Sequence, residues 1–350
     1  MSASATIRGR LQSRSPGLWA LAWRRLCGDW VGLASLAVVL CYVVLIAASA
    51  SGLVASDWSR EAGVSYAPPV FMGPDAAPSL RDSEPVSNAG SIRSPEDSGI
   101  PDPLAEVLAD IRKELAVGSP AEARAATLAL GGDKWGRDVL KKVIKGTETS
   151  MLVGLVAAAL AVLLGTVFGA QAGYFGGRVD DFFNWFYSIF TSIPYLLLVL
   201  AIAAVLNQKG TLTVILILGF TGWTGVFRLV RAEYMKHKTR EYILAADVIG
   251  ASDARRMFVH IFPNVSHVVL VQLSLHVVWF IKSEVILSFL GFGVGVDTVS
   301  WGSMLNEAQN ELIIGKWWQL GAATVAMALL VTAFSLFTDA LRDALDPRLR

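Results

Sequence analysis

The fold is decided by the stretch Leu36-Ala-Val-Val-Leu-Cys-Tyr-Val-Val-Leu-Ile46, an apolar run without a charged side chain. With its flanks it is long enough to cross a hydrocarbon core about 30 Å thick as a helix. Five further runs of this kind begin near Ser150, Phe182, Thr211, Val265 and Gln319. The sequence therefore predicts an all-α integral membrane protein with six transmembrane helices.

The composition of the whole chain agrees with this prediction. Of its 350 residues, 54% are hydrophobic and only 17% are charged, which is unusual for a soluble domain of this length. The net charge of +1 gives no reason to expect nucleic acid as a partner. Ala48-Ser49-Ala50 resembles a signal-peptidase site, but the apolar region of a signal peptide is usually about 7 to 15 residues long and closer to the N-terminus. We therefore expect the first run to be a retained span.

Basic residues near the spans predict the orientation, because cytoplasmic loops are enriched in Lys and Arg. Such residues cluster before the first span, between spans four and five, and after the last span: Arg8, Arg10, Arg14, Arg24, Arg25; Arg228, Arg231, Lys236, Lys238, Arg240, Arg255, Arg256; and Arg342, Arg348, Arg350. We expect a multi-pass membrane protein with both termini in the cytoplasm.

The spans divide the chain into four parts. We expect a cytoplasmic segment (1–30), a first transmembrane helix (31–54), an external insert (55–149) and a five-helix core (150–350) with a cytoplasmic loop (232–264). The insert begins with residues typical of irregular segments and continues with an amphipathic helix over Pro103–Leu115. A capping-box pattern at Ser119–Glu122 predicts another short helix. The insert is therefore expected to be partly helical.

The cytoplasmic loop contains a predicted helix, turn and helix over residues 241–261, which we call the finger. Its first helix carries Tyr242, Ala245, Ala246 and Ile249 at helical spacing, together with Asp247, and Gly250 predicts its end. Ser252 predicts the start of the second helix, and Pro263 its end. Paired alanines on an exposed apolar face would allow another protein to approach the backbone closely. The alternative is that the finger only packs on its own spans.

Other residues within the spans suggest packing or a solute pathway. Gly165, Gly169 and Gly173 form a stripe at a spacing of four, which favours close helix packing over a role in lining a pathway. Pro194 predicts a kink in span three, for the shape of the bundle or for gating.

Ionisable residues late in span five are the best pathway candidates. Lys282 and Glu284 are costly in lipid unless they pair, face a cavity or reach the membrane boundary, where they would only anchor the helix. For His276 we expect a hydrogen bond within the bundle rather than a place in a polar route. His267 and His276 have no carboxylate or thiol at ligand spacing, so no metal site is predicted.

The finger resembles the coupling loop of importer-type ABC permeases, above all the C subunits of dipeptide and oligopeptide permeases. The family pattern is Glu-Ala-Ala, three residues, Gly, and later Leu-Pro. Ala245, Ala246, Gly250 and Pro263 fit this pattern, whereas Leu244 replaces the Glu and Phe262 replaces the Leu. Three other stretches are similar to family motifs: Asp133–Leu140 (with Gly132 in place of a Thr), Ala172–Asp180, and Leu287–Gly293 together with Leu341–Leu349.

The resemblance implies a type I ABC importer permease fold, a location in a bacterial inner membrane, and a transport subunit rather than an enzyme. It implies four kinds of partner, namely a second related permease, two ATPase subunits, an extracytoplasmic binding protein and a peptide. The chain itself would bind no cofactor, since it has no Gly-x-x-x-x-Gly-Lys-Ser/Thr loop and ATP and Mg would belong to the ATPases. Peptides are the favoured substrate, and nickel complexes or glutathione are alternatives within the same family.

Three other classes of membrane protein would show different sequence features. A secondary transporter should show repeated halves and broken helices around a midplane site, and no repeat is evident. A membrane-embedded enzyme should place catalytic groups at suitable spacing, and none converges. A structural scaffold would not need the finger.

Overall fold

The computed structural model describes residues 18–73, 124–295 and 297–345, and within these ranges the fold is all-α, with isolated bridges but no β-strand. The chain divides into two compact units, unit 1 (Met1–Asp57 and Lys141–Arg350) and unit 2 (Trp58–Leu140). The helices are α1 (Leu18–Gly28), α2 (Trp30–Ala50), α4 (Val139–Phe175), α5 (Gly177–Thr191), α6 (Tyr195–Leu206), α7 (Thr211–Thr221), α8 (Thr224–Lys238), α9 (Glu241–Val248), α10 (Asp253–Arg255), α11 (Phe262–Phe289), α12 (Trp301–Ile313) and α13 (Trp318–Leu345).

The long helices confirm the predicted membrane spans. In the described residues, five helical segments are long and apolar enough to cross a membrane: Trp30–Ala50, Val139–Phe175, Thr211–Lys238, Asp253–Phe289 and Trp318–Leu345. A sixth span is obtained if α5 and α6 are counted together, although these helices meet at an angle of 81°. Pro194 lies at this break as the N-cap residue of α6. The kink expected at this proline is therefore a sharp bend.

Hydrophobicity alone did not reveal three helical features. α4 begins at Val139, well before the apolar run at Ser150. Its first turns carry polar side chains such as Lys142 and Glu148, so they do not stand out by hydrophobicity. α1 precedes the first span, from which it is separated at Asp29, whose carboxylate accepts from the backbone N–H of Val31 at 3.0 Å. α12 lies between the last two spans and begins with a capping box made by Ser300 and Ser303.

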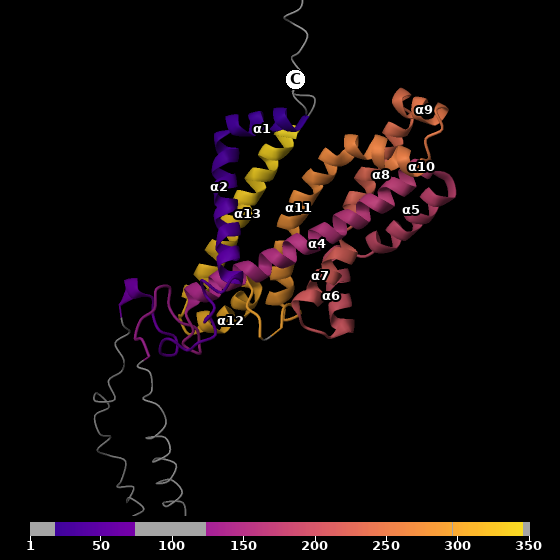
Figure 1. The fold of residues 1–350 in the computed structure, drawn as a ribbon. Helices are drawn as coiled ribbons and strands as arrows, with labels where there is room; N and C mark the ends of the chain where they lie inside the picture. The colour runs from indigo at the N-terminus through magenta and orange to yellow at the C-terminus, as the bar shows by residue number, and fades with distance from the viewer. Residues whose placement is uncertain (1–17, 74–123, 296, 346–350) are drawn as a thin grey trace, which may run out of the picture. The chain divides into compact units, whose positions relative to one another are not determined.

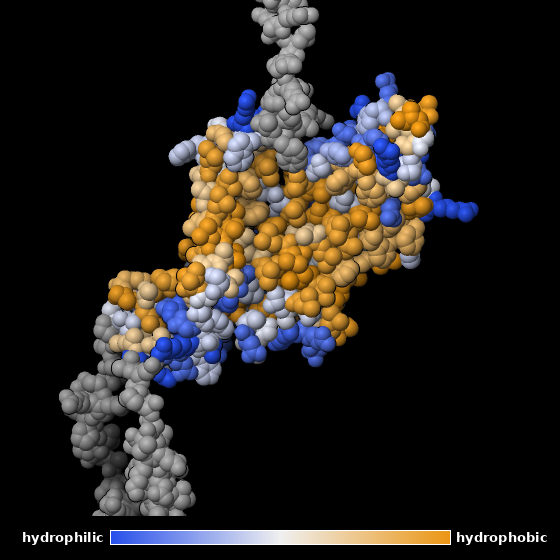
Figure 2. Space-filling model, viewed as in Figure 1, coloured by the Kyte–Doolittle hydropathy of each residue, from blue (hydrophilic) through white to orange (hydrophobic). Residues whose placement is uncertain are grey.

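Unit 1 is a bundle in which α13 packs along α2. The Tyr42 hydroxyl of α2 donates to the carbonyl oxygen of Ala326 at 2.9 Å. Leu26 of α1 packs against the end of α13 at Ala340 and Ala344. Figure 1 shows α1, the end of α13 and α9 at one end of the bundle and α12 at the other. Hydrophobic residues form a broad band across these helices in Figure 2, and hydrophilic residues gather around α9 and α10.

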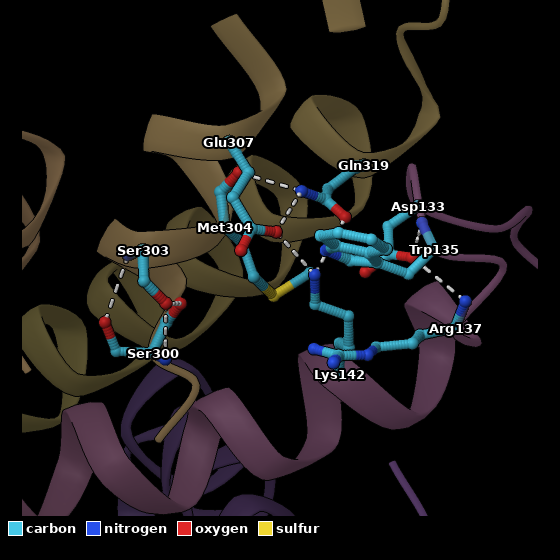
Figure 3. Close-up of polar contacts among 9 residues, drawn as sticks. All are labelled: Asp133, Trp135, Arg137, Lys142, Ser300, Ser303, Met304, Glu307 and Gln319. Carbon is cyan, nitrogen blue, oxygen red and sulfur yellow. Dashed lines mark hydrogen bonds and ion pairs between the residues drawn. The ribbon is translucent and has the colours of Figure 1, made fainter. Parts of the chain in front are cut away.

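Unit 2 contains a tight turn around Asp133, which is drawn in Figure 3. Asp133 is buried, and its Oδ1 accepts from the backbone N–H groups of Trp135 (2.8 Å) and Arg137 (2.9 Å). Gly136 has a φ of +76°, and a Cβ there would lie 2.1 Å from the carbonyl oxygen of Gly63, so only glycine fits. The helices predicted at Pro103–Leu115 and Ser119–Glu122 lie outside the described residues.

Candidate functional site

The finger consists of α9, a turn at Gly250, α10 and a π-helical turn (Arg256–Ile261). Gly250 has a φ of +81°, and the next N–H, that of Ala251, donates to the carbonyl oxygen of Ala246 at 3.0 Å. Such a positive φ favours glycine and closes the helix end. The Ser252 hydroxyl accepts from the backbone N–H of Arg255 at 3.4 Å. The turn and the cap therefore lie where the sequence predicts them.

The tip of the finger exposes large apolar side chains. Val248 is 88% exposed and Ile249 is 83% exposed, with Leu244 and Tyr242 also exposed beside them. Ala245 shares this exposed face. Apolar surface of this kind, rimmed by polar residues, is typical of a contact site for another protein. The finger thus exposes apolar side chains that do not take part in its packing on the bundle.

Ala246 does not belong to the exposed face, so this part of the sequence prediction is wrong. Ala246 and Ile243 are both buried, because the inner side of α9 packs towards the bundle. Ile243 shares a hydrophobic cluster with Tyr234 of α8 and Met257 of the π-helical turn. The Tyr234 hydroxyl also donates to the carbonyl oxygen of Met257 at 3.2 Å. The base of the finger is therefore fixed to α8.

A polar cluster ties both helices of the finger to the end of α4. The Tyr174 hydroxyl donates to Oδ1 of Asp253 at 2.7 Å. Arg256 forms an ion pair with the same carboxylate at 2.7 Å and another with Asp247. The guanidinium of Arg256 lies 5.9 Å from the centre of the Tyr174 ring, within range of a cation–π contact. Asp247 thus contributes to bracing the finger rather than to its apolar surface.

Tyr242 connects the start of α9 with the neighbouring helices. Its hydroxyl lies 2.9 Å from Nδ1 of His237 and accepts from the Asn264 side chain at 3.5 Å. Partial burial raises the pKa of the Tyr242 phenol above its ordinary value, which is already well above neutral pH, so the hydroxyl is protonated. Tyr242 therefore acts as a neutral hydrogen-bonding contact between α8, α9 and α11.

Pro263 does not end the second helix of the finger, which corrects the sequence prediction. The helix continues from Asp253 to Phe289 as one segment, and Pro263 lies in the first turn of α11. The N–H of Phe262 donates to the carbonyl oxygen of Met257, five residues earlier, which is the π-helical pattern. Because regular α-helical bonding restarts after this turn, the missing N–H of proline falls where it is tolerated.

The glycine stripe of α4 faces α8 directly. A Cβ added at Gly165 would lie 2.7 Å from the carbonyl oxygen of Trp223, at Gly169 2.8 Å from that of Phe227, and at Gly173 2.5 Å from that of Arg231. All three nearest backbone atoms belong to α8 or its N-cap, so any side chain would push the two helices apart. The stripe therefore brings α4 close to the helix that supports the finger.

The two ionisable residues late in α11 point in different directions. Glu284 is fully buried, and its carboxylate accepts from the hydroxyls of Ser150 (2.8 Å) and Ser288 (2.7 Å). Ser150 in turn accepts from the backbone N–H of Trp301 at 3.3 Å. Glu284 thus links α4, α11 and α12 from inside the bundle. Lys282 is exposed on another face of α11.

His276 lies inside the bundle. Its Nδ1 is 2.7 Å from the carbonyl oxygen of Gln272, one turn earlier in α11, and its ring makes edge contacts with Trp279 and Phe280. In the described residues, no group of three His, Cys, Asp or Glu side chains is placed to hold a metal ion. The pathway roles suggested for His276 and Pro194 stay predictions.

A second polar network lies at the end of the bundle that carries α12, as Figure 3 shows. The buried ammonium of Lys142 forms an ion pair with Glu307 at 2.6 Å and donates to Oε1 of Gln319 at 3.2 Å. Nε2 of Gln319 donates to the carbonyl oxygen of Met304 at 3.1 Å. Sequence reasoning missed this network because its members lie far apart in the chain. The bracing cluster at Asp253 and Arg256 had a local signal, their spacing of three on a capped helix.

Comparison with known proteins gives consistent matches. Residues 144–350 match the family described as binding-protein-dependent transport system inner membrane component. The chain is 38% identical over 220 residues to the dipeptide transport system permease protein DppC of Bacillus subtilis, an alignment that covers 63% of this chain and 68% of that protein. It is 36% identical over 220 residues to the oligopeptide transport system permease protein OppC of Bacillus subtilis, with 63% and 72% covered. For the di/tripeptide transport system permease protein DppC of Pseudomonas aeruginosa, the identity is 34% over 225 residues, with 64% and 74% covered.

Proposed function

The chain belongs to the family of binding-protein-dependent transport system inner membrane components, and from this premise we propose that it forms half of the translocation pathway of an ATP-driven peptide importer. A second related permease forms the other half. Two ATPase subunits bind ATP and Mg, and an extracytoplasmic binding protein delivers the peptide. This chain is a transport subunit and holds no nucleotide itself.

The orientation in this proposal follows from charge. The finger, α1 and the end of α13 share one end of the bundle, and Arg25, Lys238, Arg240, Arg255 and Arg342 lie on these elements or beside them. Because positive charge favours the cytoplasmic side, this end faces the cytoplasm. The ATPase subunits then dock there.

The apolar tip of the finger is the observation that carries the proposal. Val248 and Ile249 are almost fully exposed, yet the residues beneath them are buried and fixed to α4 and α8. A rigid base under an exposed apolar tip suits a contact that must transmit force. When the ATPase subunits close, their movement displaces the finger, and the continuous helix from Asp253 to Phe289 passes the displacement to the spans.

A matched pair of substitutions tests the contact. Ile249 and Ile313 are each 83% exposed, but Ile249 is at the tip of the finger and Ile313 ends α12. We expect that Ile249→Asp removes the ATPase subunits from the complex purified in mild detergent, whereas Ile313→Asp retains them. A complex that keeps its ATPase subunits and its peptide-stimulated ATP hydrolysis despite Ile249→Asp would refute the docking site.

Peptides are the proposed substrate because the relatives named above are dipeptide and oligopeptide permeases. A nickel complex or glutathione is the alternative within the family. Uptake of labelled dipeptide, glutathione and nickel chelate by the reconstituted complex distinguishes them. The secondary-transporter alternative has no support from a family defined by binding-protein-dependent transport.

A further inference from the structure

Lys282 lies on an otherwise apolar, exposed face of a membrane-spanning helix. Its neighbours at helical spacing on α11 are partly exposed apolar side chains, namely Leu275, Trp279, Ile286 and Phe289. In the described part of the chain, no carboxylate forms an ion pair with Lys282, and the nearby Glu284 is buried on another side of the helix. The ammonium group therefore has no ionic partner among the residues that the structure describes.

The position of Lys282 along α11 makes lipid an unsuitable environment. At 1.5 Å per residue, it lies about 10 Å before the helix end at Phe289. Helical side chains lean towards the N-terminus of the helix, so the lysine stem is directed away from this end of α11. Charged groups within membrane-spanning helices almost always face the interior of a bundle or a water-filled cavity. This face of α11 therefore adjoins protein or water.

The break between α5 and α6 independently indicates a surface that adjoins protein or water rather than lipid. Residues 191–194 are all exposed, and the chain bends there by 81°. Irregular backbone within a membrane is tolerated where it is buried in protein or lines a water-filled cavity, because lipid offers it no hydrogen-bonding partner. The exposed break is thus also unsuited to lipid.

An aromatic contact joins the two features. Tyr195 is the first residue of α6 after the break, and Trp279 is three residues before Lys282 on α11. Their ring centres are 4.2 Å apart. Side chains three apart on a helix are neighbours, so Trp279 lies beside Lys282 on the exposed face of α11, and Tyr195 packs on Trp279 directly after the break. The contact between Tyr195 and Trp279 therefore connects the break to the face of α11 that carries the lysine.

We propose that Tyr195, Trp279 and Lys282 form a subsite on the translocation route that binds peptides by their carboxylate group. The Lys282 ammonium donates to the carboxylate at the C-terminus of the peptide, and the aromatic pair contacts its apolar side chain. This inference rests on the proposed function, since it names a binding site within the pathway. It adds a preference within the transporter for substrates with a free carboxylate.

The test uses the complete complex in liposomes, with two probes, alanylphenylalanine and its C-terminal amide. Loading of each probe onto the binding protein is measured separately so that capture does not enter the comparison. Lys282→Met should lower kcat/KM for uptake of the free-carboxylate probe about tenfold, the effect of one charge-assisted hydrogen bond, and leave the amide unchanged. Lys282→Arg should retain the preference. Lys209→Met, an exposed lysine in the link before α7, is the control and should change neither.

The outcomes separate the subsite from the proposed function. If Lys282→Met changes uptake of both probes equally, or of neither, the subsite is overturned while peptide import stands. If the unchanged complex takes up neither probe, peptide import itself fails, and the subsite with it. Loss of the second permease from the Lys282→Met complex would assign Lys282 to an ion pair between subunits and would also overturn the subsite.

A chemical rescue provides a second measurement. Lys282→Cys is placed in a chain whose two free, exposed cysteines, Cys27 and Cys41, are replaced by Ser. An aminoethyl methanethiosulfonate should restore the preference for the carboxylate probe, and a sulfonatoethyl reagent should not. Alanylphenylalanine should slow the labelling. A thiol at this position that stays unreactive in the assembled complex would exclude a water-accessible subsite.

Discussion

At the α12 end of the bundle, Lys142 is buried and its ammonium is bound by Glu307 and Gln319, whereas at the α9 end Val248 and Ile249 are left exposed. The first end uses polar groups to hold its own helices together. The second uses a polar cluster around Arg256 to brace the base of the exposed tip. The buried charge at the first end is therefore satisfied within the chain, whereas the exposed apolar tip at the second end lies on a braced base.

The difference shows that exposure and charge have to be considered together. A charged residue in a membrane protein is easily taken as a sign of function, yet Lys142 joins α4 to α12 and α13 in the manner of a structural contact. An apolar side chain is easily taken as core or lipid-facing, yet Ile249 is exposed beside a charged cluster.

The largest effect is expected at the α12 end. Lys142→Ala removes a buried ammonium and leaves the Glu307 carboxylate without this partner, so we expect the chain to lose about 3 kcal/mol of stability against unfolding in mixed micelles. Lys141→Ala is the matched control, because its ion pair with Asp57 is partly exposed to solvent and should contribute less than about 1 kcal/mol. Equal losses for the two lysines would contradict a structural role for the buried network.

A smaller effect is expected where α4 meets α8. A Cβ at Gly173 would lie 2.5 Å from a backbone oxygen of Arg231, so Gly173→Ala should cost about 2 kcal/mol by overpacking. Gly225→Ala, at a position with no atom within 4 Å, should be neutral or slightly stabilising. Both are measured by the same unfolding assay. Unaltered stability of Gly173→Ala would mean that the helices can separate without cost.

The smallest change in stability is expected in the bracing cluster. Tyr174→Phe removes only the hydrogen bond to Asp253, which should cost about 1 kcal/mol. Because this bond braces the finger, the number of ATP molecules hydrolysed per peptide imported should rise in the reconstituted complex. The variant Tyr187→Phe, which alters an exposed hydroxyl on α5, is the control. An unchanged ratio would show that the finger transmits force without this brace.

Sequence patterns were most reliable where one physical property decides the structure. Hydrophobic length located the spans, and Pro194 located the bend between α5 and α6. Gly250 and Ser252 located the turn of the finger because a positive φ and a helix cap each demand particular residues. Resemblance to a permease family was carried by motifs and agrees with the family match.

The same patterns failed where tertiary contacts decide the outcome. Helical periodicity placed Ala246 on the same face as Ala245, but the cluster around Tyr234 and Ile243 buries it. Pro263 was predicted to end the helix. The effect of a proline depends on the hydrogen-bonding pattern just before it, and here that pattern is a π-helical turn after which the helix continues. No local signal could have paired Lys142 with Glu307 and Gln319, because only the folded chain brings α4, α12 and α13 together.

The π-helical turn at Arg256–Ile261 has one further consequence, for the kinds of sequence change that the finger tolerates. Such a turn accommodates one residue more than a regular helix would, within a segment that is otherwise continuous to Phe289. Deleting a single residue there would return the turn to regular α-helical bonding and leave the helix before and after it in nearly the same relative orientation. A single deletion in the regular helix beyond the turn would instead rotate everything before it by about 100° relative to the rest of α11, so that the apolar tip faced in a new direction. Homologous permeases that differ in length by one residue in this segment should accordingly differ within the π-helical turn.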